Sequence, residues 1–250
     1  MTNDINNTTT TTMAPQPTSE LDTPAKDLTA TIPDTFNQLP PLPSPPLPQH
    51  PAFHHYKPPV PPTYPGYSVF LAGSIEMGRA IQWQSHILPF LHNLPLTICN
   101  PRRSTWDSAP DAAQRLRDME RQVDWELQAL DACDVICFFF DKATMSPVTM
   151  MELGLWARSG KAVVCCDDGV QAGGDADADA NGNAHKGFWK GTNVRMVCER
   201  YGVPHVRRFE ELVTEVKSML ARKGMRVEEV EWKGESVDEE EEGQEGGVSL

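Results

Sequence analysis

The stretch that decides the fold is DVICFFFDKATMSPVTMMELGLWA, residues 134–157. Its first part, Asp134–Phe140, is a nearly continuous apolar run, which is typical of a strand buried on both faces of a parallel sheet. Ser146-Pro147 then predicts the start of a helix, with Ser as the N-cap and Pro at the first helical position. A buried strand followed by a helix is the repeating unit of α/β proteins.

The same alternation of strands and helices continues on both sides of this stretch. Further strands are predicted at 67–72, 96–99, 161–166 and 203–206, and further helices at 78–92, 109–132, 191–201 and 209–222. In the long second helix we expect an inward apolar stripe at helical spacing, formed by Leu116, Met119, Val123, Leu127 and Leu130. The pattern predicts an α/β fold with five parallel strands and helices on both faces.

Three segments differ from this pattern in composition. Residues 1–65 are rich in Thr and Pro, with 12 prolines between Pro40 and Pro65, and are predicted to be disordered. Residues 169–187 predict a flexible insertion, and 226–250 an acidic disordered tail. Ten acidic residues and one Lys between Glu228 and Leu250 account for most of the net charge of −13, so this charge does not describe a binding surface. The folded domain is therefore expected at 66–225.

Composition also argues against several classes of protein. No apolar run is long enough for a membrane span, and the first residues lack the pattern of a secretory signal. No basic patch with interleaved aromatic residues suggests nucleic-acid binding. The six cysteines lie mostly in apolar segments, which favours reduced, buried thiols in a cytoplasmic protein, and their spacing does not favour a metal site.

Glu152 is the only charged residue between Ala143 and Ala157. A carboxyl group in such apolar surroundings is costly to bury, so it is usually paired or functional. The alternative is an ordinary Glu on the solvated face of a helix, and this segment alone leaves both possibilities open.

Polar residues gather where the predicted strands end. In a parallel sheet the carboxyl ends of the strands form the edge at which ligands bind. Asn and Asp are also common turn residues, so a purely structural role is the alternative for several of them. The candidates at this edge are Gly73, Ser74, Asn100, Arg102, Arg103, Asp141 and Ser146.

Several short motifs now occur in one order along the chain. They are Phe70-Leu71-Ala72-Gly73-Ser74-Ile75, Trp125-Glu126-Leu127, and Ser146-Pro147 followed by Glu152-Leu153-Gly154. Over about 67–220 the sequence resembles the nucleoside 2-deoxyribosyltransferase superfamily, which includes 2′-deoxynucleoside 5′-phosphate N-hydrolases. Asn100-Pro101-Arg102-Arg103 and Gly191-Thr192-Asn193 also have counterparts in a "deoxyribosyltransferase-like" branch.

The resemblance implies a flavodoxin-like (Rossmann-like) three-layer sandwich and cleavage of the N-glycosidic bond between a base and deoxyribose. It implies that Glu152 attacks C1′ and forms a glycosyl ester, while Glu126 orients it or moves a proton. Contacts to the substrate would come from Gly73, Ser74, Ile75 and Ser146, with Asn193 matching a residue that reaches a neighbouring subunit's site. It implies a nucleoside or nucleotide substrate, no cofactor, and a dimer or larger homo-oligomer.

One departure bears on the substrate. Relatives that hydrolyse nucleoside monophosphates carry Arg directly after Gly-Ser-Ile, whereas this chain has Glu76. A carboxylate there disfavours a 5′-phosphate, unless Arg79, Arg102 or Arg103 compensates. We therefore expect base exchange, with hydrolysis by the same residues as the alternative. A non-catalytic nucleotide-binding or scaffold protein, whose Pro-rich segment binds partner domains, is the alternative from a different class.

Overall fold

A computed structural model describes residues 31–103, 111–167 and 186–226 of the chain. Two predicted segments lie outside the described residues: the acidic tail except for its first residue, and the insertion except for its last two.

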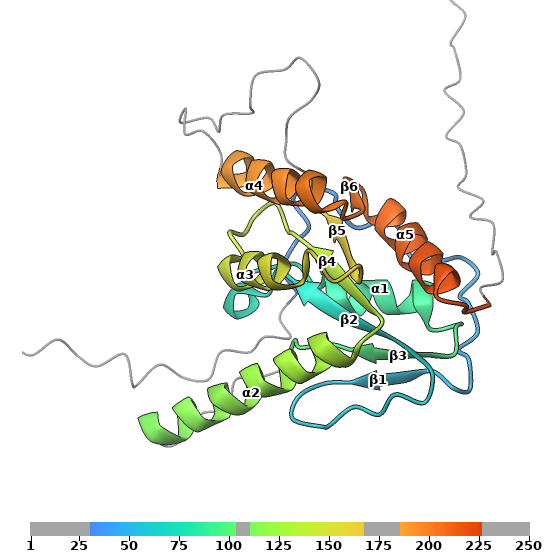
Figure 1. Cartoon of the computed structure of the whole chain (residues 1–250), viewed down its shortest axis with the longest axis horizontal. Coiled ribbons are helices and arrows are strands. Elements are labelled where there is room, and N and C mark those ends of the chain that lie inside the picture. The colour runs from blue at the N-terminus through green and yellow to red at the C-terminus, as the bar shows by residue number, and fades with distance from the viewer. Residues whose placement is uncertain (1–30, 104–110, 168–185, 227–250) are drawn as a thin grey trace, which may run out of the picture.

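Six parallel strands form one sheet in the order β1-β3-β2-β4-β5-β6 (Figure 1). The five predicted strands are all present, and their order is that of flavodoxin-like folds. The sixth strand, β1, was not predicted, and it pairs with β3 at the edge of the sheet. The strands are β1 His54–Tyr56, β2 Tyr67–Gly73, β3 Leu96–Cys99, β4 Val135–Phe139, β5 Ala162–Cys165 and β6 His205–Val206.

Helices cover both faces of the sheet, so the predicted α/β three-layer sandwich is confirmed. Residues of α1 and α5 pack on one face, and residues of α2, α3 and α4 on the other. The helices are α1 Trp83–Leu91, α2 Ala112–Ala132, α3 Pro147–Trp156, α4 Lys186–Tyr201 and α5 Phe209–Arg222, and a short 3-10 helix, η2, covers Glu76–Gly78.

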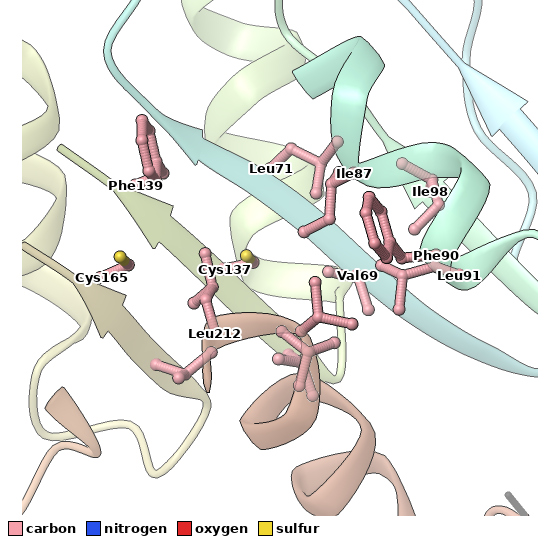
Figure 2. Packing of buried hydrophobic residues seen from close by; sticks show 14 of the residues in the cluster. Val69, Leu71, Ile87, Phe90, Leu91, Ile98, Cys137, Phe139, Cys165 and Leu212 are labelled. Atoms are coloured by element: carbon pink, nitrogen blue, oxygen red, sulfur yellow. The ribbon is translucent and has the colours of Figure 1, made fainter. Parts of the chain in front are cut away.

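Alternation along the strands divides the core into two clusters. Val69 and Leu71 of β2 lie with Ile87 and Leu212 in the cluster under α1 and α5, which Figure 2 shows. Their neighbours in sequence point to the opposite face, where they meet α2, α3 and α4. Because successive side chains of a strand point to opposite sides, a strand that is apolar throughout is buried on both.

The predicted inward stripe of α2 is wrong. Leu116, Met119, Val123 and Leu127 are 39–61% exposed, and only Leu130 of the five is buried. The helix instead packs through Gln122, Trp125 and Ala129. Trp125 lies against Phe70, with ring centroids 6.3 Å apart, and its indole N–H donates to the carbonyl of Val60 at 2.8 Å. The indole ring packs against Phe70, and its N–H bonds to Val60. The face of α2 that carries Trp125 is therefore the buried one.

The segment from 31 to 65, here called the N-terminal strap, is ordered against the domain, contrary to the prediction for 1–65. Besides forming β1, it places Leu39 and Phe53 against the core. Backbone carbonyls of the strap meet side chains of α1 and of the residue that follows it: His86 contacts the carbonyl of Pro40 at 2.7 Å, and His92 that of Leu47 at 2.8 Å. Proline removes backbone donors but leaves these acceptors, so a Pro-rich chain can still be held by tertiary contacts.

All six cysteines are free and buried, as predicted. Within the described ranges, no helix has the length and apolar character needed to cross a membrane.

Candidate active site

The topology of the sheet creates one natural position for a site. The helices that follow the adjacent strands β2 and β4, α1 and α3, lie on opposite faces of the sheet. The loops leaving these two strands therefore diverge and open a crevice at their carboxyl ends, where ligands of such sheets bind. Together with the last residue of β2, the two loops contain five of the eleven predicted site residues: Gly73, Ser74, Ile75, Asp141 and Ser146.

Gly73 ends β2 at a point where no side chain fits. A Cβ atom there would lie 2.5 Å from the carbonyl oxygen of Phe139 and 2.5 Å from the ring of Trp83. The next amide, Ser74 N–H, donates to that same Phe139 carbonyl at 3.0 Å. Glycine is thus required by close approach of the backbone to β4, and it brings Ser74 to the crevice.

A buried cluster of hydroxyls joins the two loops. Ser74 Oγ lies 2.5 Å from Ser146 Oγ, which lies 2.9 Å from Thr144 Oγ1. The amide of Asp141 donates to Ser74 Oγ at 2.8 Å. Ser146 occupies the predicted N-cap of α3, but its side chain makes no capping bond and turns into this cluster instead. The geometry brings the predicted residues Ser74 and Ser146 together.

Glu76 caps α3 in place of Ser146. Its Oε1 accepts the amide N–H of Met145 at 2.5 Å and that of Ser146 at 2.6 Å. A carboxylate is favoured at this end of a helix, because unpaired N–H groups and the helix dipole both attract negative charge. Sequence reasoning saw Glu76 only as a departure from relatives and did not predict this contact.

Lys190 of α4 is a buried cation beside the same cluster, and sequence reasoning missed it. Its side chain is 1% exposed, and Nζ donates to the carbonyl of Thr144 at 2.6 Å and to that of Asp141. Burial lowers the pKa of Lys190, and Cys166, Asp141 and Glu76 oppose this shift. The predicted helix at 191–201 and the Asn193 motif pointed to this region, but only the fold shows that α4 turns a lysine inward.

Glu126 and Glu152 approach each other from α2 and α3. Glu152 is 7% exposed and Glu126 is half-buried. Burial and then the nearby carboxyl of Glu126 raise the pKa of Glu152 to about 8. Burial also raises the pKa of Glu126, against the effects of Gln122 and Arg103. Two carboxyl groups this close in a poorly solvated place tend to share one proton near neutral pH.

Polar residues of the loop after β3 orient Glu126. The side-chain amide of Gln122 donates to Glu126 Oε1 at 2.5 Å and to the carbonyl of Pro101 at 3.0 Å. Arg103 donates to the other end of the same amide. Arg103 therefore helps to hold the Gln122 amide that orients Glu126.

Asn100 and Arg102 hold the loops together. Asn100 Oδ1 accepts the amide N–H of Arg102 at 2.9 Å, so Asn100 has the structural turn role that the sequence left open. Its Nδ2 meets His55 of β1. Arg102 is 3% exposed and donates to the carbonyls of Ile81 and Ala80 at 2.7 and 2.8 Å. Burial lowers its pKa to about 10, with Asp141 opposing.

Asp141 is fully buried, and its carboxylate is shared among three segments of the chain. Oδ1 accepts the side-chain amide of Gln38 at 3.0 Å and the amide of Ala143 at 2.9 Å, while Oδ2 accepts the amide of Ile81 at 2.9 Å. Gln38 also accepts the amide of Lys142. Asp141 thus ties the strap to both loops of the crevice.

The last two predicted residues lie apart from these contacts. Ile75 precedes η2 and offers its carbonyl to the amides of Gly78 and Ala80. Asn193 is exposed on α4, where its side-chain amide donates to the carbonyl of Trp189 at 2.8 Å. In this single chain the structure does not bring Asn193 to Glu126 and Glu152.

A cavity of about 180 Å³ opens elsewhere on the carboxyl edge. It lies between the strap, the ends of β4 and β5 and the start of α5, and its lining includes Gln38, Lys142 and Phe209 but neither Glu126 nor Glu152. Within the described residues, no three His, Cys, Asp or Glu side chains are grouped to hold a metal ion.

These observations define an α/β protein of flavodoxin-like topology with a pair of acids on α2 and α3 and a buried cluster of hydroxyls between the loops that follow β2 and β4. Residues 66–170 match the model of the family described as "Nucleoside 2-deoxyribosyltransferase like". The match spans β2 to β5 and includes both acids, so the resemblance seen in the motifs is confirmed over this part of the chain. A search of curated proteins found no match.

Proposed function

We propose that this protein is an enzyme that cleaves the N-glycosidic bond of a nucleoside and transfers the (deoxy)ribosyl group to another base. The observation that carries the proposal is the pairing of Glu152 with Glu126: burial raises the pKa of both carboxyl groups, and Glu126 raises that of Glu152 as well. Two carboxyl groups with raised pKa are suited to acid–base or nucleophilic catalysis. Burying them without such a use makes a fold less stable.

The chemistry takes two steps. The ionised Glu152 carboxylate attacks C1′, the bond from C1′ to the base nitrogen breaks, and the base leaves with the electron pair. Glu126, having taken the proton of the pair from Glu152, protonates the departing base. An acceptor base then attacks C1′, breaks the ester and releases Glu152, while Glu126 takes up the acceptor's proton. Splitting one difficult displacement in this way is the logic of retaining glycosidases.

Hydrolysis is the same sequence with water in place of the acceptor base. A chromatographic assay for free base distinguishes the two when deoxynucleosides and ribonucleosides are tested with and without an acceptor base. Exchange that needs the acceptor supports transfer, and release without it supports hydrolysis.

The decisive variants are Glu152→Gln and Glu126→Gln, with Glu199→Gln as control. Glu199 is a carboxyl in an exposed ion pair on α4, so its loss should leave activity unchanged. We expect Glu152→Gln to lose at least about 10³-fold in kcat, because no nucleophile remains. Wild-type activity of Glu152→Gln would reject the assignment. If neither base release nor exchange occurs with any substrate, a non-catalytic binding role replaces the proposal.

We also propose that two copies associate through α2 and α3. On α2, Leu116, Met119, Val123 and Leu127 form the exposed stripe; on α3, Val148, Met151 and Leu155 form another. At about 100° per residue, Glu126 and Glu152 each lie beside the stripe of their own helix. An apolar surface of this kind marks an interface, and a partner here would cover the acidic pair.

Light scattering after size exclusion tests this association. Val123→Glu should shift a dimer to a monomer and reduce activity together, whereas Gln128→Glu on another exposed face of α2 should change neither. A wild-type chain that is monomeric at micromolar concentration would contradict the proposal.

The six free, buried thiols support a reducing compartment such as the cytoplasm.

A further inference from the structure

The side chain of Gln38 joins the N-terminal strap to the loop that follows β4. Its amide nitrogen donates to Asp141 Oδ1 at 3.0 Å, and its amide oxygen accepts the backbone N–H of Lys142 at 2.9 Å. The two bonds use both ends of one planar amide, so they fix the loop in direction as well as in distance. Gln38 lies outside residues 66–170, so the family match assigns it no role.

Asp141 connects this contact to both loops of the crevice. Its Oδ2 accepts the amide of Ile81, at the far end of the loop after β2, at 2.9 Å. Its own amide donates to Ser74 Oγ at 2.8 Å, and Ser74 Oγ lies 2.5 Å from Ser146 Oγ at the start of α3. A short series of buried contacts therefore leads from Gln38 to the helix that carries the proposed nucleophile.

The backbone around Gln38 is fixed independently of these two bonds. Leu39 N–H donates to Asp34 Oδ2 at 2.7 Å, and the Leu39 side chain packs against the core. Pro40 is buried, and its carbonyl meets His86 at 2.7 Å. A side chain that extends from a fixed backbone is preorganised to hold its partner in one place.

The strap is held to the domain at several points besides Gln38. β1 pairs with β3, His92 contacts the carbonyl of Leu47 at 2.8 Å, and Trp125 donates to the carbonyl of Val60 at 2.8 Å. These contacts lie further along the strap and do not depend on the loop after β4. The two bonds of Gln38 therefore act mainly on that loop, because the strap is docked without them.

We infer that Gln38 is a positioning residue, which fixes the loop after β4, and with it the start of α3, in the arrangement that the N-glycosidic reaction requires. This inference rests on the proposed function. The alternative is that Gln38 only adds stability to the strap. The two roles differ in their effect on rate, because a displacement of about 1 Å at reacting groups can cost about 10²-fold in rate.

Three variants of the full chain test the inference. Gln38→Leu keeps the approximate size of the side chain and removes both bonds. Gln38→Glu keeps the acceptor for Lys142 N–H but places a carboxylate against that of Asp141. Gln49→Glu is the matched control, because Gln49 is an exposed glutamine of the same strap.

The pH dependence of Gln38→Glu tests the bond to Asp141 itself. Two carboxyl groups at hydrogen-bond distance tend to share a proton as pH falls, and the protonated group can then donate as the Gln38 amide does. Arg102 and Lys190 interact with the charge of Asp141 and favour its ionised form, so the proton is expected on the pair toward pH 5 and not at pH 8.

Two readouts are compared with wild type at pH 5 and pH 8, well below the Tm of each variant. The first is kcat/KM for base release, and the second is hydrogen exchange of the backbone amides of 141–146 without substrate. We expect Gln38→Leu to lose at least about tenfold in kcat/KM at both pH values. Gln38→Glu should lose as much at pH 8 and recover most of it at pH 5. Both variants should exchange faster than wild type at pH 8, and Gln49→Glu should match wild type throughout.

The inference is overturned if Gln38→Leu keeps the wild-type kcat/KM, even with a lower Tm, or if Gln38→Glu is as impaired at pH 5 as at pH 8. If wild type releases no base from any substrate, the proposed function fails, and hydrogen exchange alone decides the role of Gln38. Faster exchange of 141–146 in Gln38→Leu would then support its hold on the loop, and unchanged exchange would overturn it.

Discussion

At the scale of single residues, the ionisation of Glu152 controls the proposed reaction. A nucleophile must be a carboxylate, yet burial and then Glu126 raise the pKa of Glu152 to about 8. In the free protein at pH 7 the proton of the pair therefore lies mostly on Glu152, and kcat/KM should fall as pH rises through about 8, where the pair loses the proton that the departing base needs.

The pH–rate profile of Glu126→Gln separates the two causes. Removing the neighbouring carboxyl removes a like charge but not the burial, so the midpoint at which Glu152 ionises should move to lower pH while the rate itself falls. An unchanged midpoint would mean that Glu126 does not interact with Glu152.

The same carboxyl affects stability with a defined sign. A group whose folded pKa lies above its unfolded value near 4.5 contributes stability that is fully present below pH 4.5 and is lost as pH rises through about 8. Glu152→Gln removes this penalty, so it should be more stable than wild type at pH 9, by on the order of a few kcal/mol, and not at pH 5. Urea unfolding at the two pH values measures the difference. Equal destabilisation at both would show that Glu152 is structurally required instead.

At the scale of elements, two glycines offer a matched pair. Gly73→Ala forces a methyl group within 2.5 Å of the Phe139 carbonyl and the Trp83 ring, and should cost about 2–4 kcal/mol. Gly154→Ala adds a methyl with nothing within 4 Å inside helix α3, and should gain about 0.5–1 kcal/mol. Thermal unfolding of both variants checks the two signs. A neutral Gly73→Ala would mean that β2 can move away from β4.

The elements themselves could be predicted from the sequence, whereas the orientation of α2 could not. The buried strands read as apolar runs because both of their faces meet helices, and that signal is local. The apolar residues of α2 recur at helical spacing, but periodicity does not tell whether a stripe meets the chain's own core, and here four of the five predicted residues face outward. Trp125, which packs on Phe70 and bonds to Val60, turns that stripe outward.

The candidate site, too, was only partly predictable from the sequence. Glu126 and Glu152 could be found from motifs, because each motif is local. The roles of Asp141, Arg102 and Lys190 depend on partners far along the chain: Gln38, Ala80 and Thr144. Such contacts leave no periodic trace in the sequence, and a buried lysine reads like an exposed one.

At the scale of the whole molecule, the N-terminal strap is part of the folding unit. Composition predicted disorder for residues 1–65, but β1, Gln38 and Leu39 all contact the domain. Removing 1–30 should leave Tm nearly unchanged, whereas removing 1–62 should lower it by about 10 °C, because an edge strand and several apolar contacts are lost. Equal Tm values for the two truncations would return the domain boundary to residue 66.

The proposal that Glu152 forms a glycosyl ester is tested most directly by a search for the ester itself. Wild type and Glu152→Gln would be incubated with a deoxynucleoside, quenched in acid, and examined by intact-protein and peptide mass spectrometry. We expect one added deoxyribosyl group on wild type, carried by Glu152, and none on Glu152→Gln. Base release by wild type at full rate with the sugar attached to another residue, or release that persists in Glu152→Gln, would contradict it.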